Sequence, residues 1–126
     1  MTATLSAWPS ELRLKKGRQT LAITWDDGST SELAAEYLRV QSPSAEVKGH
    51  TPSERKTVGG KRDVTISAIE PVGNYAVRLV FADGHSTGIY TFRYLAELAR
   101  DHDRIWQDYL TELEAKGLAR DRPGAL

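Results

Sequence analysis

The sequence contains no cysteine, and this absence removes several kinds of site from consideration. Without thiols there is no disulfide framework, no thiolate nucleophile, no cysteine-ligated iron–sulfur cluster and no cysteine-based zinc site. An excess of one charge is also missing, because 17 Lys and Arg residues balance 17 Asp and Glu residues. A balanced chain has no overall field that favours nucleic acid or an anionic membrane, so we expect neither as a partner.

Long apolar runs are absent as well. The first 17 residues lack the apolar core of a signal peptide, and no run reaches the roughly 20 residues that cross a bilayer. We therefore expect a cytoplasmic protein. At 126 residues the chain is long enough for a single domain, whose last residues, 118–126, we expect to form a flexible tail.

Two stretches of the sequence, residues 23–38 and 81–98, follow the same plan. Each has an apolar strand that ends in an aromatic residue, an Asp-Gly turn, a return strand with Ser and Thr, and the dipeptide Tyr-Leu. Asp-Gly is typical of the two-residue type I′ hairpin turn, which needs positive φ angles. The matched positions are Trp25 and Phe81, Asp27-Gly28 and Asp83-Gly84, and Tyr37-Leu38 and Tyr94-Leu95. We interpret the two stretches as an internal duplication.

Hydrophobic periodicity places the predicted elements around these stretches. Strands are predicted at 11–16, 20–25, 63–72 and 75–82, helices at 34–40 and from 91, and a C-terminal helix at about 103–117. In the last strand, alternation puts Tyr75, Val77, Leu79 and Phe81 on one face. The expected fold is α+β, a two-layer sandwich in which a duplicated strand–turn–strand–helix unit forms one mainly antiparallel sheet.

Residues 41–62 form a long polar segment between the two copies, with two Pro and three Gly. Long loops in compact domains are usually functional or mobile. The basic residues Arg39, Lys61 and Arg62 flank this segment, and either a solvated loop or an edge that binds an anion or a partner accounts for them. The run Gly-Gly-Lys-Arg-Asp is not a Walker A motif, because it lacks the spaced first Gly and the Lys-Ser/Thr pair.

The run EPVGNYAVRLVFADGHSTGIYTFRYL, with the upstream Trp-Asp-Asp-Gly hairpin and YLRVQSPSAEV, resembles a known family. It is similar to the gamma-butyrobetaine hydroxylase-like N-terminal domain, formerly domain of unknown function 971, over about residues 10–100. That domain occurs alone in small bacterial proteins. It is also fused to 2-oxoglutarate-dependent hydroxylases of carnitine biosynthesis and to nucleotide-binding iron–sulfur scaffold proteins.

The resemblance implies a zinc-binding module, since the hydroxylases carry three Cys in a C-P-C-x-x-C run and a His after the second hairpin turn. By position, these ligands fall on Ser42, Ser44, Val47 and His85, around a retained Pro43. Ser hydroxyls are poor zinc ligands and Val offers no donor atom. We therefore do not expect the family's zinc site here, and of its ligands only His85 remains.

His85 has two interpretations. It is either a polar residue that hydrogen-bonds the loop, or a ligand of a divalent metal such as iron or zinc, together with His50 and Glu46. No His is followed by the x-Asp/Glu of the usual oxygenase triad. No other cofactor is expected.

The leading hypothesis is a non-enzymatic accessory module that binds a protein partner, because no complete catalytic set is present. Turn chemistry accounts for the carboxylates Asp26, Asp27 and Asp83, because Asp favours such bends. The residues proposed to bind the partner are Arg39, Ser42, Pro43, Ser44, Lys61, Arg62 and Trp106. The alternative, which the family's fusions imply, is a metal-handling accessory protein linked to iron–sulfur cluster biogenesis or iron-dependent hydroxylation. A stand-alone enzyme is the third option, and the sequence favours no particular oligomeric state.

Overall fold

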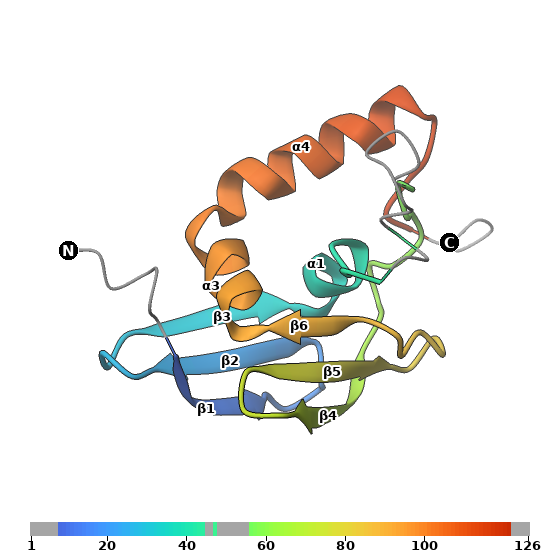
Figure 1. The fold of residues 1–126 in the computed structure, drawn as a ribbon. Coiled ribbons are helices and arrows are strands. Elements are labelled where there is room, and N and C mark those ends of the chain that lie inside the picture. The colour runs from blue at the N-terminus through green and yellow to red at the C-terminus, as the bar shows by residue number, and fades with distance from the viewer. Residues whose placement is uncertain (1–7, 45–46, 48–55, 122–126) are drawn as a thin grey trace.

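The computed structural model describes residues 8–44, 47 and 56–121, and its elements follow one another in two similar series (Figure 1). The first series is β1 (Pro9–Leu14), β2 (Thr20–Trp25), β3 (Thr30–Ala34) and α1 (Ala35–Val40). The second is β4 (Ile66–Val72), β5 (Ala76–Phe81), β6 (Ile89–Thr91) and α3 (Phe92–Arg100), and α4 (His102–Ala115) follows it. Each copy therefore has three strands and a helix: the predicted strand–turn–strand–helix unit, preceded by a strand that was predicted at 11–16 in one copy and at 63–72 in the other.

The α+β class is confirmed, but the strands form two sheets rather than the single sheet that was expected. One sheet has the order β1-β2-β3 and the other β4-β5-β6, and every pairing is antiparallel. β2 pairs with β1 and β3, and β5 pairs with β4 and β6. Each central strand thus has both of its edges paired within its own copy. In Figure 1 the strands occupy the lower part of the molecule and the helices lie above them.

Equivalent backbone hydrogen bonds show that the two copies share one local plan. Where β3 passes into α1, the amide of Ala35 donates to the carbonyl of Gln19 at 2.8 Å. Where β6 passes into α3, the amide of Phe92 donates to the carbonyl of Tyr75, also at 2.8 Å. The first strand of each sheet has a register shift opposite the same position of its neighbour, at Trp25 in one copy and Phe81 in the other. The duplication is thus visible in the backbone.

The hairpin turns are one residue longer than predicted. The Trp25 carbonyl accepts from the Gly28 amide at 2.9 Å, and the Trp25 amide donates to the Ser29 carbonyl at 2.8 Å. The turn at Asp83-Gly84 repeats both bonds, at 3.0 and 2.9 Å. In both turns only the glycine has a positive φ, 89° in the first and 94° in the second. This is the pattern of a three-residue turn with a bulge, not of a type I′ turn.

Alternating residues of β2 and β5 supply the core that the two sheets share with the helices. The buried positions on these strands include Leu21, Ile23, Trp25, Val77, Leu79 and Phe81, all in one cluster with residues of α1 and α3. Tyr75 does not join them: it precedes β5 and is 49% exposed, so its predicted inward position is wrong. The predicted strand faces are otherwise confirmed.

The C-terminal part of the chain packs over α1. Tyr109 and Leu113 of α4 form a second small cluster with Val40. Beyond α4, residues 118–121 run beside 60–62, with carbonyls of Ala119 and Arg120 accepting backbone hydrogen bonds. The first residues of the expected flexible tail thus have defined contacts with the domain. No helix among the described residues is long and apolar enough to cross a bilayer.

Candidate functional site

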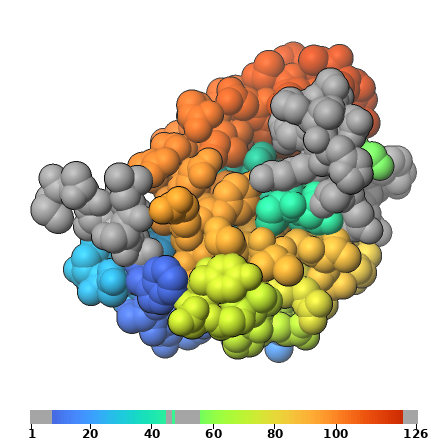
Figure 2. Space-filling model, viewed as in Figure 1, coloured from blue at the N-terminus to red at the C-terminus, as the bar shows by residue number. Residues whose placement is uncertain are grey.

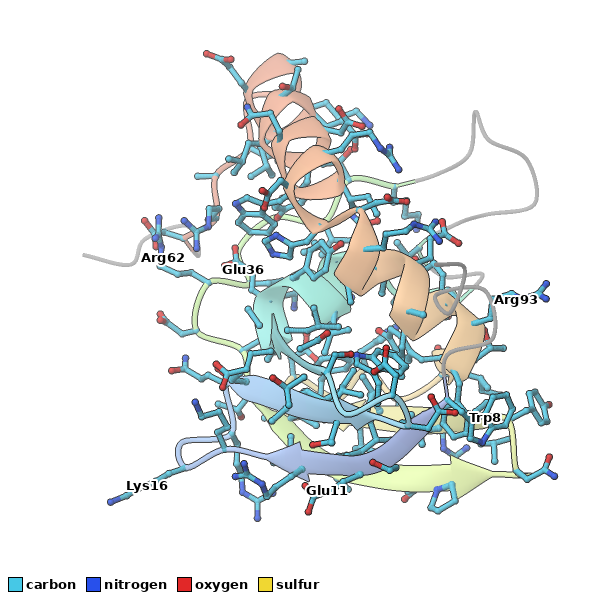
Figure 3. The ribbon with its side chains drawn as sticks, turned by 90° about the vertical axis from the view of Figure 1, so that its left-hand side faces the viewer. Trp8, Glu11, Lys16, Glu36, Arg62 and Arg93 are labelled. Carbon is cyan, nitrogen blue, oxygen red and sulfur yellow. The ribbon has the colours of Figure 1, made fainter. Side chains whose placement is uncertain are left out.

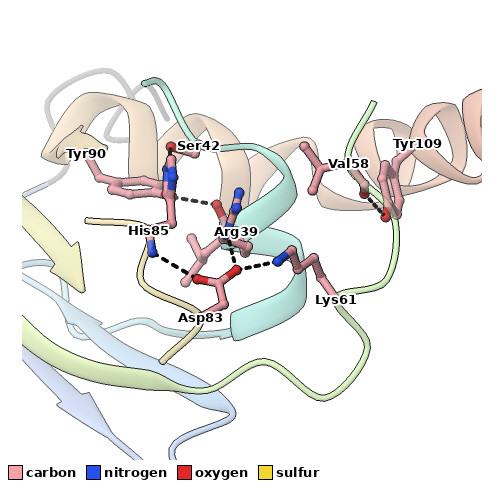
Figure 4. A network of polar contacts seen from close by, with 9 residues as sticks. Arg39, Ser42, Val58, Lys61, Asp83, His85, Tyr90 and Tyr109 are labelled. Carbon is pink, nitrogen blue, oxygen red and sulfur yellow. Dashed lines mark hydrogen bonds and ion pairs between the residues drawn. The ribbon is translucent and has the colours of Figure 1, made fainter. Parts of the chain in front are cut away.

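A group of polar side chains lies where the turn between β5 and β6 meets the C-terminal end of α1 (Figure 4). We call this group, Arg39, Ser42, Lys61, Asp83 and His85, the closed junction. Arg39 lies in the last turn of α1 and Ser42 lies two residues after the helix ends. Lys61 comes from the segment before β4, and Asp83 and His85 come from the turn after β5. Segments far apart in the sequence therefore converge on one turn.

Ser42 and His85 make the central contact of the closed junction. Ser42 Oγ lies 2.9 Å from His85 Nε2, and the two residues are 1% and 8% exposed. Ser42 Oγ also accepts a hydrogen bond from the amide of Ser44 at 3.2 Å. Ser44 Oγ in turn lies 2.7 Å from the hydroxyl of Thr87. Buried polar groups are stable when they are paired in this way, so the contacts fix the chain after α1 against the hairpin.

Asp83 is the charged centre of the junction. Its Oδ2 accepts from Arg39 Nε at 2.9 Å and from Lys61 Nζ at 2.5 Å, while its Oδ1 accepts from the His85 amide at 3.0 Å. Burial alone would raise the pKa of Asp83, but the hydrogen bonds from Lys61, the His85 amide and Arg39 outweigh it and lower the pKa to about 2. The carboxylate is therefore a permanent anion that holds two cations near physiological pH.

The backbone comes unusually close at Gly88. A Cβ added there would lie 2.5 Å from Ser42 Oγ, 3.2 Å from Tyr90 Cε1 and 3.4 Å from Pro43 Cδ. Tyr90 itself is buried, and its hydroxyl donates to the Leu38 carbonyl at 2.6 Å. Burial raises the pKa of Tyr90. Only glycine therefore fits at position 88 without displacing the residues that line the junction.

The predicted site residues fall into three groups. Arg39, Ser42, Pro43, Ser44, Lys61 and His85 are brought together at the closed junction. Arg62 pairs instead with Asp121, and Trp106 on α4 stacks under the guanidinium of Arg120 at 5.2 Å and packs against Tyr37. His50 and Glu46 lie outside the described residues, so the three-residue metal site stays a prediction.

The junction residues do not fit the zinc ion that the family resemblance implies. Ser42 and Ser44 present neutral hydroxyls that are engaged in hydrogen bonds, and Val47 is a buried aliphatic residue. His85 is the single imidazole among these positions, and zinc prefers several thiolate or imidazole ligands. Within the described ranges, no group of three or more His, Asp and Glu side chains could hold a metal ion.

Sequence reasoning missed two charged contacts. Asp83 was interpreted only as a turn residue, yet it holds Arg39, which lies 44 positions earlier. Glu36 is 6% exposed and accepts two hydrogen bonds from Arg120, at 2.9 and 2.7 Å. Neither pair has a local pattern, because the partners are brought together by the packing of the helices.

Comparisons with known proteins agree with the family resemblance. Residues 12–96 match the model of the family described as gamma-butyrobetaine hydroxylase-like, N-terminal. One similar protein with an NMR solution structure is 44% identical, with a TM-score of 0.77, over 91% of this chain and 90% of that one. Another, also solved by NMR, is 45% identical, with a TM-score of 0.77, over 90% of this chain and 85% of that one. A crystal structure of a protein of unknown function from Acidithiobacillus ferrooxidans, in the DUF971 family, is 38% identical with a TM-score of 0.62, over 79% of this chain and 97% of that one. Curated protein sequences give no match.

Proposed function

Because the chain belongs to the gamma-butyrobetaine hydroxylase-like N-terminal domain family, we propose that it is a non-enzymatic member that acts by binding another protein. One observation carries the proposal: where the family resemblance places metal ligands, this chain has the hydrogen-bonded contact of Ser42 with His85. A buried serine–histidine contact keeps the junction folded without a metal.

Most polar groups of the closed junction bond to one another, although the buried Nη1 of Arg39 has no hydrogen-bond partner among the described residues. Arg39 and Lys61 both pair with Asp83, and their side chains are only 11% and 22% exposed. A reaction centre needs groups that can reach a substrate, and these groups face one another instead. The contacts of the junction therefore support a binding role, because they hold the surrounding segments in place and present no groups to a substrate.

The surface that we assign to the partner lies beside the junction, on the segment 56–62. Tyr109 of α4 holds this segment by donating to the Val58 carbonyl at 2.6 Å, and Thr57 donates to Glu112 at 3.1 Å. Arg62 projects from it with a side chain that is 45% exposed (Figure 3). Arg62 pairs with Asp121, but both side chains are exposed, so this ion pair is weak and an acidic patch of a partner can compete with Asp121 for the cation.

The experiment compares Arg62→Glu with a matched control, Arg93→Glu. Arg93 is also exposed but lies on α3, away from Arg62 in Figure 3. Partners are captured from native cells with the tagged wild type, identified by mass spectrometry, and then measured as purified proteins against all three chains. We expect reversal of a rim charge to weaken binding for Arg62→Glu alone, mainly through slower association at low salt. Equal affinity of the two variants would remove this segment from the interface.

The alternative role in metal handling depends on His85 together with His50 and Glu46. It predicts one bound metal per chain in untagged protein and its loss in His85→Ala, which elemental mass spectrometry measures. The binding role predicts no such His85-dependent metal. The same preparations thus separate the two hypotheses.

A further inference from the structure

A second junction, between the β2–β3 turn and α3, has the same position in the first copy as the closed junction has in the second. We call it the open junction, because a cavity of about 180 Å³ lies there. Its lining residues are Trp25, Asp27, Ser29, Ser31, Ala96, Ala99 and Arg100. The cavity is unrelated to the surface assigned to the protein partner.

Reciprocal hydrogen bonds establish which residues of the two helices correspond. Tyr37 of α1 donates to the Leu98 carbonyl at 2.7 Å, and Tyr94 of α3 donates to the Gln41 carbonyl at 2.6 Å. Tyr37 matches Tyr94, so Leu98 matches Gln41. The same offset matches Ala96 with Arg39, and Ala99 with Ser42.

The two turns correspond as closely as the helices. Asp27 Oδ1 accepts from the Ser29 amide at 2.9 Å, as Asp83 Oδ1 accepts from the His85 amide at 3.0 Å. In the closed junction, Arg39 of the facing helix α1 donates a hydrogen bond from its guanidinium to the Asp83 carboxylate. In the open junction the facing residue is Ala96, which has only a methyl group.

The missing side chain leaves both space and an unmatched charge. Among the described residues, no cation forms an ion pair with Asp27. Arg100 also lines the cavity, but it pairs with Asp101 through two hydrogen bonds at 3.2 and 3.0 Å. The inner wall is apolar: Trp25 is 5% and Ala96 is 7% exposed, and the Trp25 indole N–H is already bonded to Ser31 at 2.9 Å.

We propose that the open junction binds an alkylguanidinium group, with Asp27 in the role that Asp83 plays for Arg39. The guanidinium would pair with the carboxylate, and the alkyl chain would lie against Trp25, Ala96 and Ala99. The chain's own Arg39–Asp83 contact provides the geometric precedent. The site does not depend on the proposed protein partner, so either can fail alone.

The test is a titration of the full chain with ethylguanidinium chloride, followed by NMR at the Trp25 indole N–H. Potassium chloride at the same ionic strength corrects for screening. We expect a saturable shift that weakens several-fold in Asp27→Asn, because this variant lacks the carboxylate charge that would pair with the guanidinium. Asp26→Asn is the matched control, since the neighbouring carboxylate does not line the cavity, and it should bind as the wild type does.

A filling variant tests the correspondence with the closed junction directly. Ala96→Arg places the equivalent of Arg39 opposite Asp27, so it should abolish the ethylguanidinium shift while the melting temperature is kept or raised. A non-saturable shift, equal binding by Asp27→Asn, or full binding by a folded Ala96→Arg variant would each overturn the proposal. Acetyl-arginine amide, titrated in parallel, distinguishes the sources: tighter binding than ethylguanidinium indicates an arginine of a peptide, and weaker binding a free small molecule.

Discussion

The two hairpin–helix junctions have the same backbone plan, but large polar side chains fill one of them and small apolar side chains line the other. The closed junction is filled by Arg39 and Ser42, whereas the open junction has Ala96 and Ala99 at the matching positions and a cavity between helix and turn. Both carboxylates accept from the amide two residues later, so the turn itself does not decide the difference. The side chains of the facing helix decide whether a repeated scaffold forms a structural contact or leaves a binding site.

The two helices also differ in how far later parts of the chain bury them. Glu36 of α1 is buried under α4, where Arg120 pairs with it, whereas Arg93, at the matching position of α3, is exposed. The space-filling view shows α4 as a ridge along one side of the molecule (Figure 2). The chain after α3 therefore covers Glu36 of α1 but leaves Arg93 of α3 exposed.

The largest effect is expected where the junctions are alike, at the aromatic residues under both turns. Trp25→Ala and Phe81→Ala should each lower the free energy of unfolding by about 3–5 kcal/mol, because both side chains are buried in the common core. Urea denaturation measures this loss. Tyr75→Ala is the exposed control and should change stability by less than about 0.5 kcal/mol. An unchanged midpoint for either core variant would show that the strand faces are misassigned.

The next effect concerns the unequal cover of the two helices. Arg120→Ala should cost about 2–3 kcal/mol, since it leaves the buried Glu36 carboxylate without its partner. Arg93→Ala, the matched change on α3, should be nearly neutral. Thermal melting of both variants checks the difference. Similar losses would mean that residues 118–121 do not hold α1.

A smaller effect is expected from filling the closed junction. Gly88→Ala should lower the free energy of unfolding by about 1–2 kcal/mol, because the new methyl group would lie too close to Ser42 and Tyr90. Ser42→Ala removes the nearest atom, so the double variant should lose less than the sum of the two single losses. Strict additivity in urea denaturation would place the cause elsewhere.

The smallest expected effect is on the pH dependence of stability, in which Asp83 and Asp27 should differ. The pKa of Asp83 in the folded chain is about 2, below the ordinary value of 3.8, so its ion pairs stabilise the fold above that ordinary value and are lost as pH falls toward 2. Asp83→Asn should cost about 1 kcal/mol near neutral pH, a discounted figure because the side chain is 20% exposed. Its difference from the wild type should vanish between about pH 4 and pH 2.

Asp27 provides the contrast in that experiment. Hydrogen bonds from the side chain and backbone of Ser29 also lower the pKa of Asp27, but this carboxylate is exposed. Asp27→Asn should therefore change acid stability less than Asp83→Asn does. An equal or larger loss for Asp27→Asn would remove the electrostatic difference between the junctions.

The repeat plan and the core could be predicted from the sequence, because both rest on local patterns. Alternation on β2 and β5 identified the buried strand faces, and the Asp-Gly pairs located both hairpin turns. The turn length was mistaken, since Asp-Gly suits more than one turn type and the hydrogen bonds decide between them. The missed contacts, Arg39 with Asp83 and Glu36 with Arg120, depend on helix packing that no local pattern encodes.

The state of the His85 imidazole in the full chain shows most directly whether the closed junction is a metal-free contact. Imidazole ¹⁵N resonances are recorded for the wild type and for His85→Ala, before and after an equimolar amount of Zn²⁺ is added. We predict that the His85 resonances stay unchanged, because its Nε2 is held by Ser42 at 2.9 Å. A stoichiometric shift that disappears in His85→Ala would show that the junction holds a metal and would contradict its role as a metal-free contact.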